Sequence, residues 1–280
     1  MTQDQGGADA MAVAGVPRQV TARATWLLAP NAGPMTFDGT NSWVLHEPGR
    51  RGAVIVDPGP DDDRHLAALL RLAAERGGRV DAILLTHGHP DHTAGVRKTA
   101  RRTGAPVLAA DPRWADRVIG DCALEVAGLS IDVIRTPGHS SDSLSFRLPA
   151  EQSMVTGDTV LGRSAPVILD PDGRVDQMIR SLERIRRVLD GGQPVILPGH
   201  GPVVTEPAAQ LTLALAARQA RLAQVEEAVR DGCRTVAAIA DRLYGPFDER
   251  IRRPVEATVR AHLRYLSDHG GLSSPVQIDG

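Results

Sequence analysis

The sequence predicts an α/β domain with at least two sheets, followed by a small helical unit. From residue 18 to about residue 206, short apolar runs of strand length alternate with turn residues and with helical patterns. After Thr205-Glu206-Pro207 the pattern changes to helices alone. Because strands and helices are interspersed in the first part, it favours a layered α/β fold. We therefore expect domains at 18–206 and 207–280, and a disordered segment at 1–17, which is rich in Gly and Ala.

Short apolar runs bounded by turn residues are typical of strands. In chain order they occur at Thr21–Leu28, Asn41–Leu45, Ala53–Asp57, Ala82–Leu85, Val107–Ala109, Leu124–Val126, Ser130–Arg135, Ser143–Arg147, Met154–Thr156 and Val195–Leu197. Two segments between them, Arg64–Glu75 and Val175–Leu189, place their apolar residues at helical spacing instead. A third helical segment is predicted at Thr93–Arg102.

The C-terminal unit is predicted to hold three helices, at Ala208–Arg230, Thr235–Leu243 and Pro254–Ser267. A Gly270-Gly271-Leu272 turn and a short apolar run at Val276–Ile278 follow them. Three helices followed by a hairpin-like tail is the order of a winged-helix unit. From 208 to 280 the net charge is only +1, ten arginines minus nine acidic residues. Since this is weak for phosphate binding, we expect the unit to cover the site or to form dimer contacts.

Composition excludes several classes of protein. The formal net charge of −2 gives no general attraction to nucleic acid or to a membrane surface. Cys122 and Cys233 lie far apart, so we expect no disulfide framework and a reducing, cytoplasmic setting. The N-terminal segment carries Asp4 and Asp9 without a positively charged start, unlike a signal peptide. No apolar run reaches the roughly 18 residues that span a bilayer, so we expect no membrane partner.

The central functional signal is the run Thr86-His87-Gly88-His89-Pro90-Asp91-His92. It places four side chains of the metal-ligand type on a predicted loop between a strand and a helix. Side chains alternate in an extended segment, so His87, His89 and Asp91 are expected on one side. The turn into the helix then brings His92 back to the same cavity, and Pro90 stiffens the loop.

Three further candidates follow predicted strands and adjoin glycines: His139, Asp158 and His200. The seven side chains divide into three histidines for one metal and Asp–His–His for another, with one carboxylate bridging. Imidazole and carboxylate ligands without thiolates suit two divalent ions, Zn²⁺ first, with Fe or Mn as alternatives.

The simpler interpretation is that these are ordinary surface or core residues. A lone histidine is more often one of these than a ligand, and Asp158 or His200 alone would decide nothing. Five of the nine histidines, however, occur in the motifs described above, and the complete set favours a metal site. The other four lack such a context, and we expect His46, His65, His262 and His269 to be surface residues.

The run His87-x-His89-x-Asp91-His92, followed by His139, Asp158 and His200, resembles the metallo-β-lactamase fold superfamily over about residues 20 to 204. The resemblance implies a four-layer αβ/βα sandwich with metals at one edge. It also implies that His87, His89 and His139 hold one metal, that Asp91, His92 and His200 hold the other, and that Asp158 bridges them. Asp57, at the end of a predicted strand, would orient the metal loop, although a turn aspartate is the equal alternative.

Two such ions would activate a bridging hydroxide that cleaves an ester-type or phosphodiester bond, with Asp91 as the catalytic residue that orients the hydroxide and carries its proton. The chain has no Gly-x-Ser-x-Gly motif to suggest a serine nucleophile. Asn41, Ser140 and Arg163 are the candidate substrate contacts. For Asn41 a role in turn structure is the alternative.

Asn31-Ala32-Gly33-Pro34-Met35-Thr36, Gly39-Thr40-Asn41 and the C-terminal unit are similar to the β-lactamase-like protein 2 group, which carries a winged helix. This implies an endonuclease for single-stranded RNA. The alternatives are a thioester hydrolase of the glyoxalase II kind, a lactonase acting on a small molecule, or a winged-helix nucleic-acid-binding regulator with a vestigial hydrolase domain. A homodimer is a further expectation. Only 41 residues separate Asp158 from His200 (200 − 158 − 1), which excludes the subgroup of ribonucleases with an inserted domain.

Overall fold

The computed structural model describes residues 13–246, 248–272 and 274–278 of the chain. Within the segment that the sequence predicts to be disordered, residues 1–12 lie outside the described residues. Just after them, the Gly15 backbone nitrogen donates a hydrogen bond to the Leu28 carbonyl oxygen at 3.0 Å. Among the described residues, no helix is both long enough and apolar enough to cross a membrane.

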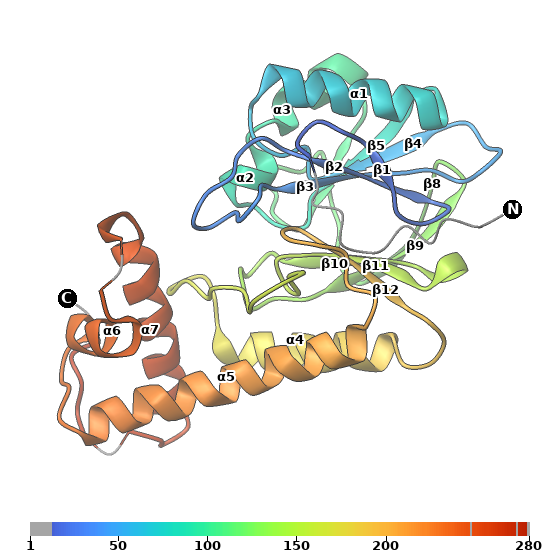
Figure 1. The fold of residues 1–280 in the computed structure, drawn as a ribbon. Helices are drawn as coiled ribbons and strands as arrows, with labels where there is room; N and C mark the ends of the chain where they lie inside the picture. Colours follow the sequence, from blue (N-terminus) through green and yellow to red (C-terminus); the bar gives the residue numbers. More distant parts are fainter. Residues whose placement is uncertain (1–12, 247, 273, 279–280) are drawn as a thin grey trace, which may run out of the picture.

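Two sheets lie face to face in the main domain, and helices cover their outer faces (Figure 1). The first sheet has seven strands in chain order: β1 (Arg18–Gln19), β2 (Ala24–Leu28), β3 (Asn41–Leu45), β4 (Ala53–Val56), β5 (Val80–Leu84), β6 (Val107–Ala109) and β7 (Arg117–Val118). The second has five in the order β12 (Val195–Pro198), β11 (Ser153–Gly157), β10 (Leu144–Leu148), β9 (Leu129–Arg135) and β8 (Cys122–Val126). Each sheet is mixed: β3–β4 is antiparallel and β4–β5 parallel in the first, and β9–β10 is antiparallel and β11–β12 parallel in the second.

The helices complete four layers, as the αβ/βα prediction requires. Helices α1 (Asp63–Gly77) and α3 (Val96–Thr103) lie outside the first sheet, while α4 (Val175–Val188) and α5 (Pro207–Arg230) lie outside the second (Figure 1). The short helix α2 (Pro90–Thr93) follows β5 at the edge of the sandwich.

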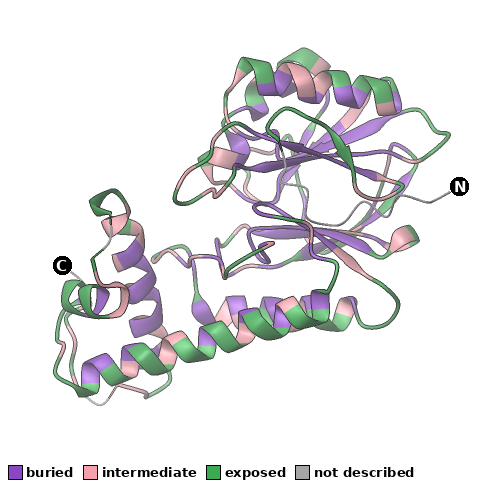
Figure 2. Ribbon diagram, viewed as in Figure 1, coloured by how far each residue is buried: buried purple, intermediate pink, exposed green. Residues whose placement is uncertain are grey.

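Period-two alternation assigns each strand residue to a layer. In β4, Val54 and Val56 point into the core between the sheets, whereas Ala53 and Ile55 pack with the apolar face of α1. The same alternation in β11 places Val155 between the sheets and Met154 against α4. Both faces of the central strands are therefore buried, whereas the outer faces of the helices are exposed (Figure 2).

The predicted elements are present, with boundaries shifted by a few residues. Strands β3 and β6 match their predicted ranges, but the two-residue strands β1 and β7 were not predicted because their exposed residues show no apolar alternation. The helix expected at Thr93–Arg102 begins earlier, with α2, and is interrupted before α3. At the interruption, a Cβ on Gly95 would lie 2.7 Å from Leu66 Cδ2, so α1 approaches the chain too closely for a side chain.

The C-terminal part contains α5, α6 (Val236–Tyr244), the 3₁₀ turn η2 (Glu249–Ile251) and α7 (Arg252–Asp268). The start of α5 packs on α4 through Leu211 and Ala214, whereas its end shares a second apolar cluster with α6 and α7. Thr235 forms a parallel bridge with Gln277 in the tail. The predicted helices are thus present, while the winged-helix assignment and the domain boundary at 207 stay predictions.

Three histidines expected on the surface are buried, so that expectation is wrong for them. His46 is 8% exposed, and His65 and His262 are 2% and 0% exposed. His65 lies on the inner face of α1, where its Nε2 atom is 3.0 Å from Ser42 Oγ. His262 lies on the inner face of α7. Helices α1 and α7 each bury one face, and the sequence around an isolated histidine does not show whether it lies on that face. Of the four histidines, only His269 is exposed.

Candidate metal centre

All seven predicted ligands lie at one edge of the sandwich, on segments that follow strands. The run from His87 to His92 connects β5 to α2, and His139 follows β9. Asp158 and His200 follow β11 and β12, which are parallel neighbours. Since these strand ends lie together, residues up to 113 positions apart (200 − 87) face one another.

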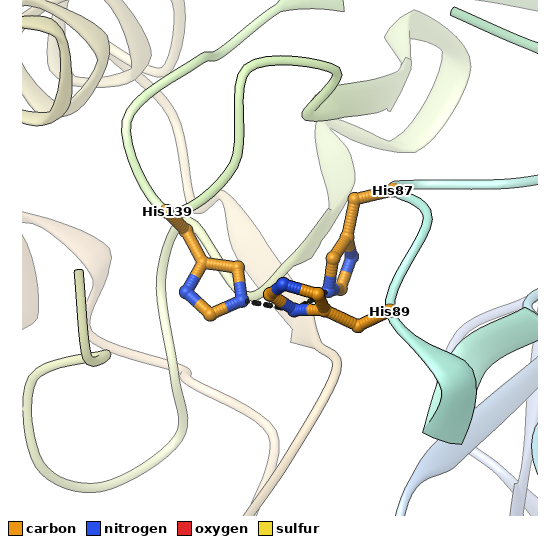
Figure 3. Close-up of side chains that lie close together, drawn as sticks. All are labelled: His87, His89 and His139. Carbon is orange, nitrogen blue, oxygen red and sulfur yellow. Dashed lines mark hydrogen bonds between the residues drawn. The ribbon is translucent and has the colours of Figure 1, made fainter. Parts of the chain in front are cut away.

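His87, His89 and His139 form the first cluster, and Figure 3 shows their rings converging. His89 Nδ1 lies 3.0 Å from His87 Nε2 and 2.9 Å from His139 Nε2. The second ring nitrogens of His139 and His87 have partners elsewhere: His139 Nδ1 is 2.8 Å from the Val167 carbonyl oxygen, and His87 Nδ1 is 3.0 Å from Thr86 Oγ1. These contacts orient the rings so that three nitrogens face a common point.

Asp91, His92 and His200 form the second cluster. His200 Nε2 lies 3.1 Å from Asp91 Oδ2 and 3.3 Å from His92 Nε2. Asp158 reaches both clusters, since its Oδ2 atom is 3.5 Å from His139 Nε2 and 3.4 Å from His200 Nε2. The structure therefore brings all seven residues together, and His87, His92 and Asp158 form a third group that overlaps the other two.

Burial and charge set the protonation of the second cluster. Burial acts to raise the pKa of Asp91, but His92 and His200 outweigh it and hold that pKa well below its usual range. Burial likewise acts to raise the pKa of Asp158, and the charges of His200 and His92 hold it low. In return, although burial opposes the change, Asp158 and Asp91 raise the pKa of His200 to about 9.

The first cluster behaves in the opposite way. Burial lowers the pKa of His139 to about 4 and lowers the pKa of His87 well below 6.5. Their neutral rings present lone pairs toward one another and toward the neighbouring carboxylates. Neutral imidazoles beside ionised carboxylates are the form in which these groups bind a divalent cation.

An unpartnered atom supports the fit to a metal. Asp158 Oδ1 is buried and has no hydrogen-bond partner, although His92 Nε2 lies within ion-pair distance at 3.5 Å. A Cβ on Gly199 would lie 2.3 Å from this oxygen and 2.9 Å from His92 Cε1, so only glycine leaves the required space. The donor set of five imidazoles and two carboxylates therefore suits divalent cations, and the clusters could hold them.

Asp57 lies beneath the loop, as expected for an orienting residue. It is 1% exposed, and its Oδ2 atom lies 2.8 Å from His92 Nδ1 and accepts a hydrogen bond from Thr86 Oγ1 at 2.6 Å. Its Oδ1 atom accepts from the Thr86 backbone nitrogen at 2.8 Å. The φ angle of +50° at Asp57 is uncommon outside glycine and aims the carboxylate at the loop. It thus fixes the orientation of His92 and leaves the Nε2 atom of His92 facing the cluster.

Two of the three predicted substrate contacts, Asn41 and Ser140, are buried and hydrogen-bonded within the protein. Asn41 is 1% exposed; its Oδ1 atom accepts from Trp26 Nε1 at 2.7 Å, and its Nδ2 atom donates to the Pro198 and Gly201 carbonyl oxygens at 2.9 Å. These bonds hold the loop on both sides of His200, and the donors of the Asn41 amide are used within the protein.

Ser140 is also buried, and its hydroxyl donates to Asp142 Oδ1 at 2.7 Å. Arg163, in contrast, lies exposed at the rim, where it pairs with Asp38 and its Cζ atom sits 5.9 Å from the centroid of the Phe37 ring. Of the three, Arg163 alone stays a candidate substrate contact.

Two rim residues were not predicted. The Phe37 ring meets the His200 ring edge-on, with 6.4 Å between centroids, and Thr40 Oγ1 lies 3.4 Å from Asp91 Oδ2. Thr40 also pairs with His200 through a backbone bridge. The Gly39-Thr40-Asn41 motif was a signal for this segment, but which of its side chains faces the site depends on the β3 register, which the motif does not give.

A four-layer sandwich with His and Asp clusters at one edge defines a class of metal-binding proteins, mostly hydrolases. The chain is similar to the metallo-β-lactamase superfamily in sequence and has the fold of its solved members. The family model described as "Metallo-beta-lactamase superfamily" matches residues 35–117. A solved metallo-beta-lactamase family protein from Thermus thermophilus superposes with a TM-score of 0.75 at 24% identity, over 89% of this chain and 95% of that one.

Two relatives are similar over most of their length. An "Atrochrysone carboxyl ACP thioesterase" of Aspergillus fumigatus is 28% identical over 286 residues, covering 95% of this chain and 86% of the relative. A "Beta-lactamase-like protein 2 homolog" of Caenorhabditis elegans is 26% identical over 263 residues, covering 90% of this chain and 86% of the relative. One relative is a thioesterase and the other a β-lactamase-like protein, so the family alone does not decide the substrate.

Replacing Asp57 with asparagine is expected to weaken metal binding by roughly 10- to 100-fold, because the amide nitrogen cannot accept a hydrogen bond from His92 Nδ1. Competition with a chromophoric chelator measures the affinity. Asp61→Asn serves as the control, since Asp61 is half-exposed and pairs with Lys98 on the surface. Equal affinities for the two variants would show that Asp57 does not orient the site.

Metal binding is expected to release protons. Although burial opposes the change, nearby carboxylates raise the pKa of His200 to about 9 and that of His92 well above its usual value. Both rings are therefore protonated at pH 7 in the metal-free protein, and a cation must displace these protons. His139, with its pKa lowered to about 4, is already neutral and releases none. The affinity should rise with pH through neutrality and up to at least pH 9. Calorimetric titration in buffers of different ionisation enthalpy counts the protons, and a count of zero at pH 7 would refute this linkage.

Proposed function

We propose that this chain is a dinuclear, zinc-dependent hydrolase of acyl thioesters. Two ligand clusters converge at one edge of the sandwich, and Asp158 contacts both. Within the second cluster, the carboxylate of Asp91 is accessible to solvent. These two observations support the proposal. The first cluster would hold one ion and the second cluster the other, with Asp158 between them. When bound, such ions supply Lewis acidity, which polarises a carbonyl oxygen and lowers the pKa of water.

Asp91 is the residue best placed to handle protons. Its side chain is 27% exposed, compared with 10% for Asp158, so it is the carboxylate that substrate and water can reach. Since its pKa is held well below the usual range, Asp91 is ionised at neutral pH and can accept a hydrogen bond from the attacking water. Thr40 Oγ1, 3.4 Å from Asp91 Oδ2, holds this carboxylate in place.

Leaving-group chemistry supports a thioester. The carboxylates of Asp91 and Asp158 both have low pKa values, so neither is a strong general acid. A thiol has a pKa of about 8.5 and can depart as the thiolate, whereas an amine or alkoxide must be protonated as it leaves. The similarity to an ACP thioesterase over 95% of the chain supports the same substrate class.

Charge at the rim disfavours RNA as the substrate. Asp142 lies beside the metal loop, where a Cβ on Gly88 would be 3.0 Å from its Oδ2 atom. Asp172 and Asp111 are near enough to interact electrostatically with Asp142, so carboxyl groups gather at this side of the loop. A phosphodiester backbone approaching this carboxylate group would be repelled. RNA cleavage is therefore the second candidate function. The sequence predicts it through the resemblance to the β-lactamase-like protein 2 group, and the similarity to the C. elegans homologue favours it.

A substrate panel with metal content measured on the same sample tests the proposal. Hexanoyl-pantetheine thioester should be hydrolysed, chelation should abolish turnover, and Zn²⁺ should restore it. Asp91→Asn should lower kcat by about 100-fold or more because the proton acceptor is lost, while circular dichroism shows an intact fold. Asp132→Asn, which alters a half-exposed surface pair with Arg147, should leave kcat unchanged.

Rapid cleavage of single-stranded RNA without thioester hydrolysis would overturn the proposal in favour of the second candidate. Full activity of Asp91→Asn on the thioester would remove Asp91 from the mechanism.

A further inference from the structure

Two arginines and a histidine lie together where α5 meets α7, outside both ligand clusters. Arg218 and Arg221 are on α5, three positions apart and therefore on neighbouring turns of one face. His262 faces them from α7. Arg218 is 5% exposed and His262 is 0% exposed.

The hydrogen-bonding capacity of this group is largely unused. Arg218 donates from Nη2 to the Pro166 carbonyl oxygen, but its buried Nε atom has no partner. The buried Arg221 Nη1 atom and the His262 Nε2 atom have no partner either. Arg221 stacks on Tyr244, with 4.4 Å between the guanidinium carbon and the ring centroid.

The positive charge of this group is not balanced. In the described part of the chain, no carboxylate forms an ion pair with Arg218 or contributes to its pKa, which burial and the neighbouring Arg221 lower to about 10. Arg218 thus remains protonated at neutral pH. A buried guanidinium without a counter-ion is strongly unfavourable, so the arrangement favours binding of an anion.

We propose that Arg218 and Arg221 form a binding site for a phosphate group. Guanidinium groups match the geometry of phosphate oxygens and form charge-assisted hydrogen bonds with them, and two cations balance a phosphate dianion. Arg221 and Tyr244 are half-buried, so solvent reaches this side of the site. His262 Nδ1 lies 2.7 Å from the Thr258 carbonyl oxygen and carries the ring hydrogen, which leaves Nε2 as an acceptor for the protonated oxygen of inorganic phosphate or of a phosphate monoester.

The phosphate site is connected to the candidate metal centre through one short segment. Arg218 binds the Pro166 carbonyl, and the next carbonyl, of Val167, lies 2.8 Å from His139 Nδ1. Asp170, further along this segment, pairs with Arg264 of α7 at 2.6 Å. Figure 1 shows α7 beside the connection between β11 and α4 that contains this segment. Arg218 and His139 therefore contact adjacent carbonyls of one backbone segment, which links the two sites.

The source of the phosphate follows from the proposed function, on which this step rests. The thiol arm of an acyl carrier or of coenzyme A is pantetheine esterified with phosphate, so the phosphate lies at the far end of the arm from the thioester. The site would bind that phosphate and align the thioester with Asp91. Free inorganic phosphate, bound as a regulator, is the other source of the same chemistry.

Binding of inorganic phosphate to the metal-free protein tests the site without relying on hydrolysis. Phosphate at about 10 mM should raise the Tm of the wild-type protein by roughly 2–5 °C. Arg221→Gln should lose this shift, whereas Arg230→Gln, which alters an exposed arginine on the same helix, should keep it. Equal shifts for all three proteins, or none, would overturn the site. Arg218→Met gives a second test, since it removes the deeper cation.

A matched pair of substrates distinguishes the two sources. The ratio of kcat/KM for hexanoyl-4′-phosphopantetheine to that for hexanoyl-pantetheine should be about 10 or more in the wild type, since one charge-assisted contact contributes about that factor. The ratio should fall toward 1 in Arg221→Gln and stay unchanged in Arg230→Gln. A phosphate-induced Tm shift with a wild-type ratio of 1 would refute the substrate-arm assignment. Hydrolysis of neither compound would refute the proposed function and leave the phosphate site to the binding experiment.

Discussion

Five imidazole rings and two carboxylates crowd into one buried space at the edge of the sandwich, and this crowding constrains the rest of the structure. Nitrogens of neighbouring rings approach one another within 2.9 Å in the first cluster and 3.3 Å in the second. Asp158 Oδ1 is buried without a hydrogen-bond partner. Two buried carboxylates in so small a space need positive charge close to them. In the metal-free protein protons on His92 and His200 supply part of that charge, and cations would supply it more fully.

The fold serves this arrangement by placing rigid strand ends around one point. Parallel pairing of β11 with β12 brings the segments of Asp158 and His200 side by side, and β5 leads directly into the loop of His87. Each segment is then fastened by buried polar residues such as Asp57 and Asn41. Hydrogen bonds within the sandwich therefore hold the ligand side chains in position in the metal-free protein.

Much of the fold and the convergence of the seven candidate ligands could be predicted from the sequence, because both depend on local signals. Strand-length apolar runs, helical spacing and the His-x-His-x-Asp-His run are readable within a few residues. Which face of a helix packs inward is not, and for this reason His65 and His262 were placed on the surface although they are buried. Asn41 was predicted to contact substrate, since the sequence does not show that its hydrogen-bond partners, Trp26 and the 198–201 loop, lie beside it in the fold. The unpaired charge of Arg218 likewise depends on how α5 and α7 cross.

Anomalous X-ray diffraction from crystals grown with Zn²⁺ tests the central claim most directly. Two anomalous peaks are expected, one among His87, His89 and His139 and the other among Asp91, His92 and His200, with Asp158 beside both. Zinc bound elsewhere on the protein, while these seven side chains keep their contacts without it, would contradict a metal centre at this edge of the sandwich.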